Sequence, residues 1–157
     1  MQNGVRKTFK LINRLMLCMW RLGWGKLVNF WPAVVGRIMV VTTTGRKSGQ
    51  LRQTPVNYAI IEGDVFCVAG FGSVSDWYRN ICCSPEVEVW LPDGKWHARA
   101  EEVGPVSAHL PWVRQVLICS GFAAFAAGAN PYRISDVHLA ELCRDYRLIR
   151  LHRLKKT

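Results

Sequence analysis

The sequence predicts an α+β protein in which antiparallel strands form a sheet that closes into a small barrel. Short strand-like segments follow one another through tight turns, of which Glu62-Gly63-Asp64 and Pro92-Asp93-Gly94 are the strongest signals. Helical segments are few and are inserted between hairpins, so the βαβ alternation of a Rossmann domain is missing. No G-x-G-x-x-G sequence is present either, which excludes that mode of dinucleotide binding.

Length and composition fit one globular domain. The chain has 157 residues, of which 50% are hydrophobic and 20% are charged. This composition excludes intrinsic disorder and supplies a sizeable core. We expect residues 1–36 to form a basic amphipathic helix and connector, and residues 37–157 to form the barrel domain.

The N-terminal segment has the pattern of an amphipathic helix. Its apolar residues recur at helical period and form one stripe: Val5, Phe9, Ile12, Met16 and Met19. Residues 1–30 are therefore expected either to lie on an anionic membrane surface or to pack on the protein's own domain. The apolar run at 15–20 is too short to span a membrane, and no secretory cleavage site follows it. We expect a cytoplasmic protein, which the first alternative would place at the inner face of the cell membrane.

The net charge of +10 is unevenly distributed. Residues 1–61 contain ten basic and no acidic side chains, because the first acidic residue is Glu62. Such a segment is expected to meet an anionic partner such as phosphates or anionic lipid. Nucleic acid is not expected, because the basic segment leads into a hydrophobic strand and no nucleic-acid-binding motif is present.

Local patterns predict the elements of the barrel in chain order. Residues 38–44 are β-branched and predict the first strand, and a polar, glycine-bracketed turn follows at 45–50. Two more strands are predicted at 52–61 and 65–69. Residues 76–83 have helical character that ends before a proline, because the residue before a proline avoids the helical region.

The second half of the chain continues this series. Alternation over 86–91 predicts a half-buried strand, and the turn after it returns the chain as a strand at 95–103. A helix at 107–119 presents one apolar face, and Ser135 is placed to cap a further helix. Residues 146–151 predict the last strand, which we expect at a solvated edge of the sheet because it is rich in arginine.

Residues 42–55 hold the first candidate site. Its cations and hydroxyl groups are of the types that hold a phosphate without a Walker sequence: Arg46, Lys47, Arg52, Ser48 and Thr54. Gly45 and Gly49 are expected to expose backbone N–H groups to the same anion. The alternative is a solvated hairpin tip, although such a tip normally mixes both signs of charge.

A second candidate site lies at residues 76–80. On a helix, Trp77 would reach the core while Asp76 and Asn80 share the neighbouring face. Trp77 and Tyr78 follow the loop Gly70-Phe71-Gly72 and could flank a planar heterocycle, or they could be core residues.

No metal site is predicted. The six cysteines include no C-x-x-C pair, and no histidine stands at finger spacing from them. Adjacent Cys82 and Cys83 are expected to be small buried hydrophobic residues rather than a redox pair.

Taken in order, these segments resemble the deazaflavin-dependent nitroreductase family. The match consists of T-T-x-G-R-K-S-G-x-x-R-x-x-P at 42–55, a glycine-containing loop, D-W-x-R-N at 76–80 and a V-x-V strand, and it covers about residues 37–103. The resemblance implies a split β-barrel related to the flavin mononucleotide-binding oxidoreductases. It also implies an enzyme that transfers a hydride from reduced coenzyme F420, an 8-hydroxy-5-deazaflavin, to a quinone-like or nitro acceptor. Split barrels often share their edges between subunits, so a homodimer is compatible with this fold.

Two alternatives to this function stay open at the level of sequence. One is a split-barrel protein that binds flavin mononucleotide (FMN) or haem, because a phosphate cradle alone does not separate FMN from coenzyme F420. The other is a non-enzymatic basic module that binds a membrane surface.

Carried over position by position, the resemblance implies that residues 37–157 form a coenzyme-binding domain with three groups of contacts. The phosphate and acidic tail would be held by Arg46, Lys47, Ser48, Gly49 and Arg52. The ring system would lie along Thr54, Pro55 and Val56, with backbone contacts from Ala69, Gly70, Phe71 and Gly72. The pocket would be completed by Asp76, Trp77 and Asn80, and the candidate catalytic residues are Tyr58, Trp77 and Tyr78.

The sequence departs from nitroimidazole-reducing members at two positions. Asn57 stands where those members carry a tyrosine, and Phe71 stands where they carry a lysine. The acceptor side of the site therefore differs, which favours a quinone over a nitroimidazole. Tyr58 and Tyr132 are the candidate proton donors or acceptor-side walls.

Overall fold

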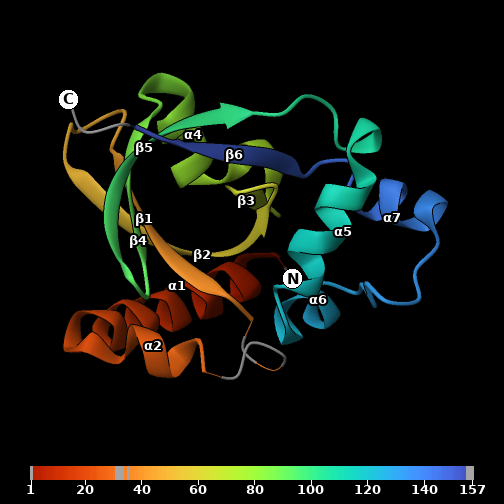
Figure 1. The fold of residues 1–157 in the computed structure, drawn as a ribbon, viewed down its shortest axis with the longest axis horizontal. Helices are drawn as coiled ribbons and strands as arrows, with labels where there is room; N and C mark the ends of the chain where they lie inside the picture. The colour runs from red at the N-terminus through yellow and green to blue at the C-terminus, as the bar shows by residue number, and fades with distance from the viewer. Residues whose placement is uncertain (1, 31–33, 35, 155–157) are drawn as a thin grey trace.

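Six antiparallel strands close into a barrel in the computed structural model, which describes residues 2–30, 34 and 36–154, with side chains described from Leu11 onward except at Val28. The strands are β1 (Ile38–Thr44), β2 (Leu51–Ile61), β3 (Asp64–Ala69), β4 (Glu86–Leu91), β5 (Gly94–Glu102) and β6 (Arg147–Arg153). Their order around the barrel is β1-β2-β3-β6-β5-β4, and β4 pairs again with β1 (Figure 1). The predicted closed barrel is confirmed.

The helices lie on the outside and at one end of this barrel (Figure 1). They are α1 (Gln2–Met19), α2 (Gly25–Val28), α4 (Asp76–Cys83), α5 (Leu110–Ile118), α6 (Phe122–Ala126) and α7 (Asp136–Leu142). A π-helical turn at Trp20–Trp24, kinked at Gly23 with a φ of +83°, joins α1 to α2, so a short second helix lies in the region expected to be a connector. Helix α4 has the predicted bounds, and the Ser135 hydroxyl caps α7 as expected.

The last strand is not at an edge, so that prediction is wrong. Strand β6 lies between β3 and β5, and all of its neighbours are antiparallel. Its arginines are explained by ion pairs with the adjacent strands, because Arg150 pairs with Asp64 and Arg147 pairs with Glu102. Barrel closure removes the free edge that an isolated arginine-rich strand would otherwise occupy.

Alternation along the strands divides the core into an interior and two outer layers. Met39 and Val41 of β1 point into the barrel interior, where Ile81 of α4 joins them, so α4 covers that end of the barrel. On one outer face, Ala59 and Phe66 pack under α5 and α7. The predicted apolar face of α5 is confirmed, since its buried residues are Val113, Val116 and Leu117.

The third layer joins the N-terminal helices to strand β1. Trp20 is 1% exposed and packs against Ile38 and Val40, with its ring edge-on to that of Trp90 at 6.2 Å. The Asn29 side chain exchanges two hydrogen bonds with the backbone of Ile38, of 2.9 and 3.1 Å. One side of this segment therefore packs on the protein's own domain, as the second alternative predicts.

The predicted apolar stripe belongs to this packed side only in part. Met16 and Met19 pack against the layer around Trp20, whereas Ile12 is 48% exposed. The side chains of Val5 and Phe9 lie outside the described residues. Within the described chain, no helix combines the length and the hydropathy that a membrane crossing requires.

Two glycines allow the start of β1 to contact the C-terminal half of the chain. Gly36 has a φ of +83°, and a Cβ atom at this position would lie 2.6 Å from the backbone of Ser120. Gly121 has a φ of +55°, and its Cβ would lie 2.5 Å from the backbone nitrogen of Gly36. The Arg37 N–H also donates to the Cys119 carbonyl at 2.6 Å, so the two segments are in direct backbone contact.

We expect Gly36→Ala to destabilise the fold more than a matched glycine substitution in open space. Gly63 has a φ of +88° with nothing within 4 Å of its missing Cβ, so Gly63→Ala should cost only the left-handed strain, about 1–2 kcal/mol. Gly36→Ala adds the backbone clash, for a further ~1–3 kcal/mol. Urea unfolding of both variants measures the difference, and equal losses would contradict the close contact with Ser120.

Candidate functional site

The turn between β1 and β2 uses most of its own backbone donors. The N–H of Gly45 donates to Gln50, and the N–H groups of Ser48 and Gly49 both donate to Gly45. The N–H of Gln50 donates to the Ser48 hydroxyl at 3.4 Å. The predicted exposure of backbone N–H groups to an anion is therefore wrong for these residues, because the turn closes on itself.

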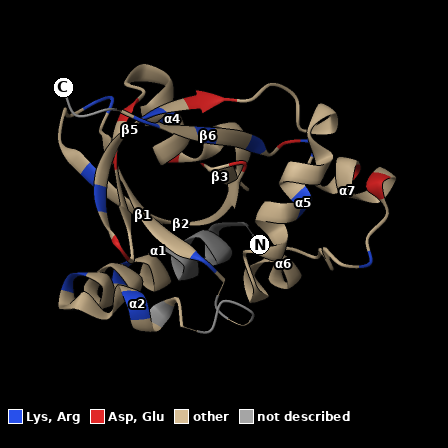
Figure 2. Ribbon diagram, in the orientation of Figure 1, with Lys and Arg blue, Asp and Glu red and all other residues tan. Residues whose placement is uncertain are grey.

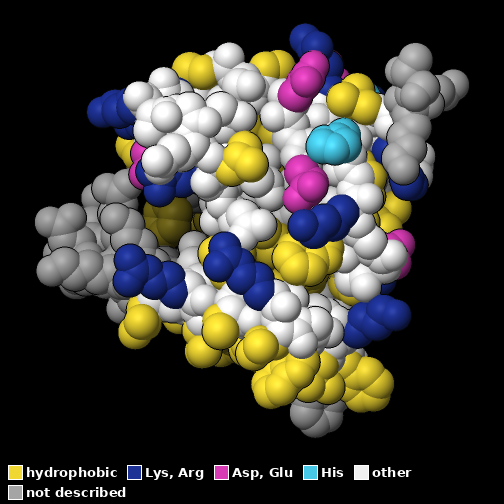
Figure 3. All heavy atoms as spheres, turned by 90° about the vertical axis from the view of Figure 1, so that its left-hand side faces the viewer, with side chains coloured by type: hydrophobic (Ala, Val, Ile, Leu, Met, Phe, Trp, Pro, Cys, Tyr) yellow, Lys and Arg dark blue, Asp and Glu magenta, His cyan; other side chains and the backbone are white. Residues whose placement is uncertain are grey.

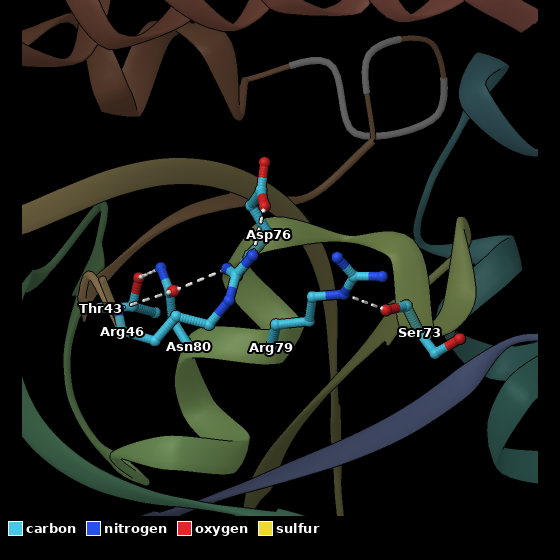
Figure 4. A network of polar contacts seen from close by, with 6 residues as sticks. All are labelled: Thr43, Arg46, Ser73, Asp76, Arg79 and Asn80. Atoms are coloured by element: carbon cyan, nitrogen blue, oxygen red, sulfur yellow. Dashed lines mark hydrogen bonds and ion pairs between the residues drawn. The ribbon is translucent and has the colours of Figure 1, made fainter. Parts of the chain in front are cut away.

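Arg46 ties this turn to helix α4 (Figure 4). Its backbone N–H and its guanidinium both donate to the Asn80 Oδ1, each at 3.2 Å. The same guanidinium pairs with the Asp76 carboxylate at 3.2 Å, with 21% of the Arg46 side chain exposed and 75% of the Asp76 side chain. The structure thus brings together three of the predicted site residues, and it occupies the Arg46 guanidinium with protein partners.

Asn80 extends the network into the barrel. It is 4% exposed, and its amide donates to the Thr43 hydroxyl at 3.1 Å. The Thr43 hydroxyl in turn donates to the Arg52 carbonyl at 3.5 Å. One buried amide therefore connects β1, β2, the turn and α4, and it fixes where the cations of the turn lie. The sequence did not single out Thr43, although the T-T-T run marked its position.

The cations that remain at this end of the barrel are exposed. Within the part of the chain that the structure describes, the Lys47 side chain has no hydrogen-bond or ion-pair partner. Arg52 is also exposed, and its guanidinium donates only to the Gln50 side chain, at 3.4 Å. Lys47 and Arg52, with the exposed Ser48 hydroxyl, are thus the groups of the predicted cradle that are available to an anion.

Arg79 is a further cation that the sequence reasoning did not assign. It lies on α4, and its Nε donates to the Ser73 carbonyl at 2.7 Å (Figure 4). Within the described residues, Asp76 pairs with Arg46, and no carboxylate pairs with Lys47, Arg52 or Arg79, so the local charge is positive. Figure 2 shows no acidic residue on α1, α2 or β1, consistent with the absence of any acid before Glu62.

The loop before α4 is held against the end of the chain. Gly72 has a φ of +55°, and a Cβ there would lie 2.2 Å from the Asp145 carbonyl oxygen, so the backbones are in contact. Phe71 is 48% exposed on this loop, next to Gly70, which is also exposed. The predicted backbone contributors Ala69 to Gly72 therefore form a fixed loop at the N-terminal side of α4.

The predicted aromatic residues lie at the margin of the barrel core. Trp77 and Tyr78 are partly exposed and pack against the interior cluster. The Tyr78 hydroxyl donates to the Glu102 carboxylate at 2.6 Å, and this bond, with burial, raises the pKa of Tyr78 above its ordinary value. Tyr78 is thus held as a neutral phenol across and well above neutral pH.

Tyr58 lies deeper than these two aromatic residues. It is 7% exposed and belongs to the barrel interior, as does Val56 two residues earlier. Burial raises the pKa of Tyr58. Thr54 and Pro55 of the same strand are partly exposed, so β2 carries the predicted ring-binding residues from the surface into the interior.

Asn57 has a structural contact in this chain. Its side-chain amide donates to the Arg37 carbonyl at 3.2 Å, beside Gly36. Position 57 therefore helps to hold the start of β1.

The exposed cysteines differ from expectation. Cys82 and Cys83 at the end of α4 are exposed, so the prediction that they are buried is wrong. The described residues contain no cluster of metal-ligating side chains.

One family model and three solved structures are similar to this chain. A family model described as F420H(2)-dependent quinone reductase matches residues 13–131. The structure is similar to that of the conserved hypothetical protein Rv2991 from Mycobacterium tuberculosis, with a TM-score of 0.57 and 18% identity over 83% of this chain and 79% of that one. It is also similar to an F420-H2 dependent reductase, FDR-A, with a TM-score of 0.50 and 22% identity over 74% and 94% of the two chains. HutZ, the heme storage protein of Vibrio cholerae, has a TM-score of 0.51 and 16% identity over 76% and 83%. At these identities the three structures show a shared barrel fold.

Asn80→Ala should loosen the candidate site through the buried amide. The substitution removes the acceptor for Arg46 and the donor for Thr43, so it should lower the free energy of unfolding by about 2–4 kcal/mol. Arg79→Ala is the matched control on the same helix, because it removes one exposed hydrogen bond and should cost under ~1 kcal/mol. Urea unfolding measures both variants. Similar losses in the two would show that the Asn80 network does not hold the turn to α4.

Proposed function

The chain belongs to the F420H(2)-dependent quinone reductase family, and we propose that it is an oxidoreductase that transfers a hydride from reduced coenzyme F420 to a quinone. The observation that carries this proposal is the group of exposed cations on a turn that a buried amide fixes to α4, inside the matched region. The family description names F420H(2), so it favours the deazaflavin over FMN as the cofactor. A nitro compound remains a second acceptor class to be compared with quinones.

The described residues fit a coenzyme with an anionic tail. Lys47, Arg52 and Ser48 are exposed, and the Lys47 ammonium has no protein partner among the described residues, so an anion need not displace an existing ion pair there. Arg46 has a different role, because its guanidinium holds Asp76 and Asn80 and thereby positions the turn. The tail site would therefore consist of Lys47, Arg52 and Ser48, with Arg46 as the residue that positions them.

The aromatic residues beside this turn supply the other half of the site. When bound, reduced F420 supplies a hydride and a proton, which together convert a quinone into a hydroquinone. Trp77 and Tyr78 present partly exposed rings at the margin of the core, and Phe71 presents another on the fixed loop. Flat apolar walls of this kind suit a ring system and an apolar acceptor. The single O–H of Tyr78 donates to Glu102, so Tyr78 would act on the acceptor through its ring rather than as a hydrogen-bond donor.

Asn57 and Tyr58 would influence which acceptor the site takes. Asn57 is engaged with the Arg37 carbonyl, so the acceptor side has a small, anchored amide at this position. The Tyr58 side chain is buried in the barrel interior, so it would hold strand β2 in place rather than contact the acceptor directly. This arrangement favours quinones over nitroimidazoles as acceptors.

Lys47→Ala should weaken binding of coenzyme F420 by about 1–3 kcal/mol, because it removes a charge-assisted contact to the tail. The loss should shrink as salt is raised, since exposed ion pairs are screened. Arg52→Ala should behave in the same way. Arg133→Ala, an exposed cation in the α6–α7 connection, is the control and should leave the affinity unchanged. Equilibrium titration measures all three, and unchanged affinity in both Lys47→Ala and Arg52→Ala would exclude this tail site.

The wild-type protein should oxidise reduced F420 faster with a menaquinone-like quinone than with a nitroimidazole. Trp77→Ala should lower turnover while leaving tail binding largely intact, because it removes ring positioning only. Trp96→Ala is the matched control, since Trp96 also packs against the barrel interior but lies on β5. Stopped-flow loss of reduced-coenzyme absorbance measures each rate. Tight coenzyme binding without oxidation by any quinone or nitro compound would place this chain among binding proteins instead.

A further inference from the structure

The N-terminal helices carry a second apolar face that the domain does not cover. On α1 and the π-helical turn, Leu11, Leu15 and Leu22 are 62–69% exposed. They recur at helical spacing together with exposed Cys18, so they form one face. Beyond the kink at Gly23, further large apolar residues of the N-terminal segment are all at least half exposed: Trp24, Leu27, Phe30 and Val34.

This face adjoins the one that packs on the barrel. Met16 and Trp20 pack against the layer of Ile38 and Val40 and lie roughly 100–180° around the helix from Leu11 and Leu15, whereas Met19 of the packed side lies only about 40° from Leu15. Figure 3 shows hydrophobic side chains gathered along the lower edge of the molecule, with Lys and Arg side chains directly above them. The helix therefore has a broad apolar surface, and within the described residues only part of it packs on the domain.

Cations border the exposed face. Arg14, Arg21 and Lys26 are exposed along the same segment, which contains no acidic residue. A shallow hollow of about 380 Å³ opens between the two arginines, and Leu17, Cys18 and Leu22 complete its lining. The Arg21 guanidinium is anchored by a 2.8 Å hydrogen bond to the Gln53 side chain, so this side of the hollow is held by β2.

We propose that this face docks on the surface of an anionic lipid bilayer. Leu11, Leu15 and Leu22 would enter the boundary between headgroups and acyl chains, while Arg14 and Arg21 would contact lipid phosphates. The helix would lie in the plane of the interface, as expected for a segment that is apolar on its outer face yet rich in cations. The proposal goes beyond the oxidoreductase function, because it uses none of the residues of the coenzyme site.

Charge decides against a second copy of the chain as the occupant. Two copies that met through this face would bring their arginines and Lys26 together, with no acidic side chain in residues 1–61 to offset them. An anionic lipid surface supplies both an apolar layer and the opposite charge. An exposed apolar face of this length on a soluble monomer without a partner would be unusual.

The full chain should sediment with vesicles of phosphatidylglycerol and phosphatidylcholine, and much less with phosphatidylcholine alone. Leu15→Ser combined with Leu22→Ser should weaken binding by about tenfold or more, because two side chains no longer enter the apolar boundary. Arg14→Gln and Arg21→Gln should each weaken it by about fivefold, with a smaller effect at high salt. Val137→Ser, a 77% exposed apolar residue on α7, is the control and should bind like wild type.

Thermal unfolding checks that the variants fold, and all five substituted residues are exposed, so their stability should be close to wild type. Binding that is equal for neutral and anionic vesicles, or unchanged in the double leucine variant, would overturn the proposal. So would concentration-dependent dimerisation that the leucine variant abolishes, in a protein that ignores vesicles. Oxidation of reduced F420 by a water-soluble quinone, measured without vesicles, should be unaffected by the leucine variant, so failure of the docking proposal is distinguishable from failure of the proposed function.

Discussion

Strand β1 is constrained on every side, and the rest of the structure depends on this. Its hydrogen-bonding edges pair with β2 and β4, which closes the barrel. Its inner face supplies Met39 and Val41 to the interior, and its outer face receives Trp20 from the N-terminal segment. Close packing on both faces and pairing on both edges leave this strand little freedom to shift. It therefore fixes the positions of the segments that precede and follow it.

The two ends of β1 carry the features that matter for function. At one end, the Asn80 amide joins Thr43 to Arg46, so the turn that follows β1 is fixed to α4. At the other end, Gly36 and Arg37 are in backbone contact with the segment after α5. A cation that forms part of this framework is occupied by protein partners, so of the adjacent Arg46 and Lys47 the first positions the turn and the second is the one we propose for the ligand. Neighbouring positions in the sequence thus have different tasks because only one of them faces the helix.

The sequence predicted the strands and α4 well because their signals are local. Alternation over 86–91 and the β-branched run at 38–44 depend only on neighbouring residues, and the proline after α4 fixes its end. Long-range partners were not predictable in this way. The position of β6 between β3 and β5, and the pairing of Arg46 with Asp76 and Asn80, exist only after closure.

The same limit applies to the N-terminal helix, where the apolar surface is broader than the predicted stripe and includes exposed Leu11 and Leu15. A hydrophobic pattern tells which residues avoid water, and it does not tell which of two apolar sides meets the protein. The side of the helix that packs on the domain is the one that carries Trp20, whose ring contacts Ile38, Val40 and Trp90. These contacts are long-range, so the spacing of apolar residues does not predict them. With that side packed, the apolar side chains of Leu11, Leu15 and Leu22 stay exposed to solvent.

The uneven charge follows from this arrangement. The ten basic residues of 1–61 belong in sequence to α1, to the turn and α2 after it, and to the segment from Arg37 to β2. A single acidic residue among them would form an ion pair with a nearby arginine and cancel the attraction for an external anion. Asp76 does this for Arg46, and it comes from α4, beyond the acid-free segment. Apart from Arg46, the described cations of this segment form no ion pair within the described residues, which fits the anionic partners proposed for the turn and for the exposed helix face.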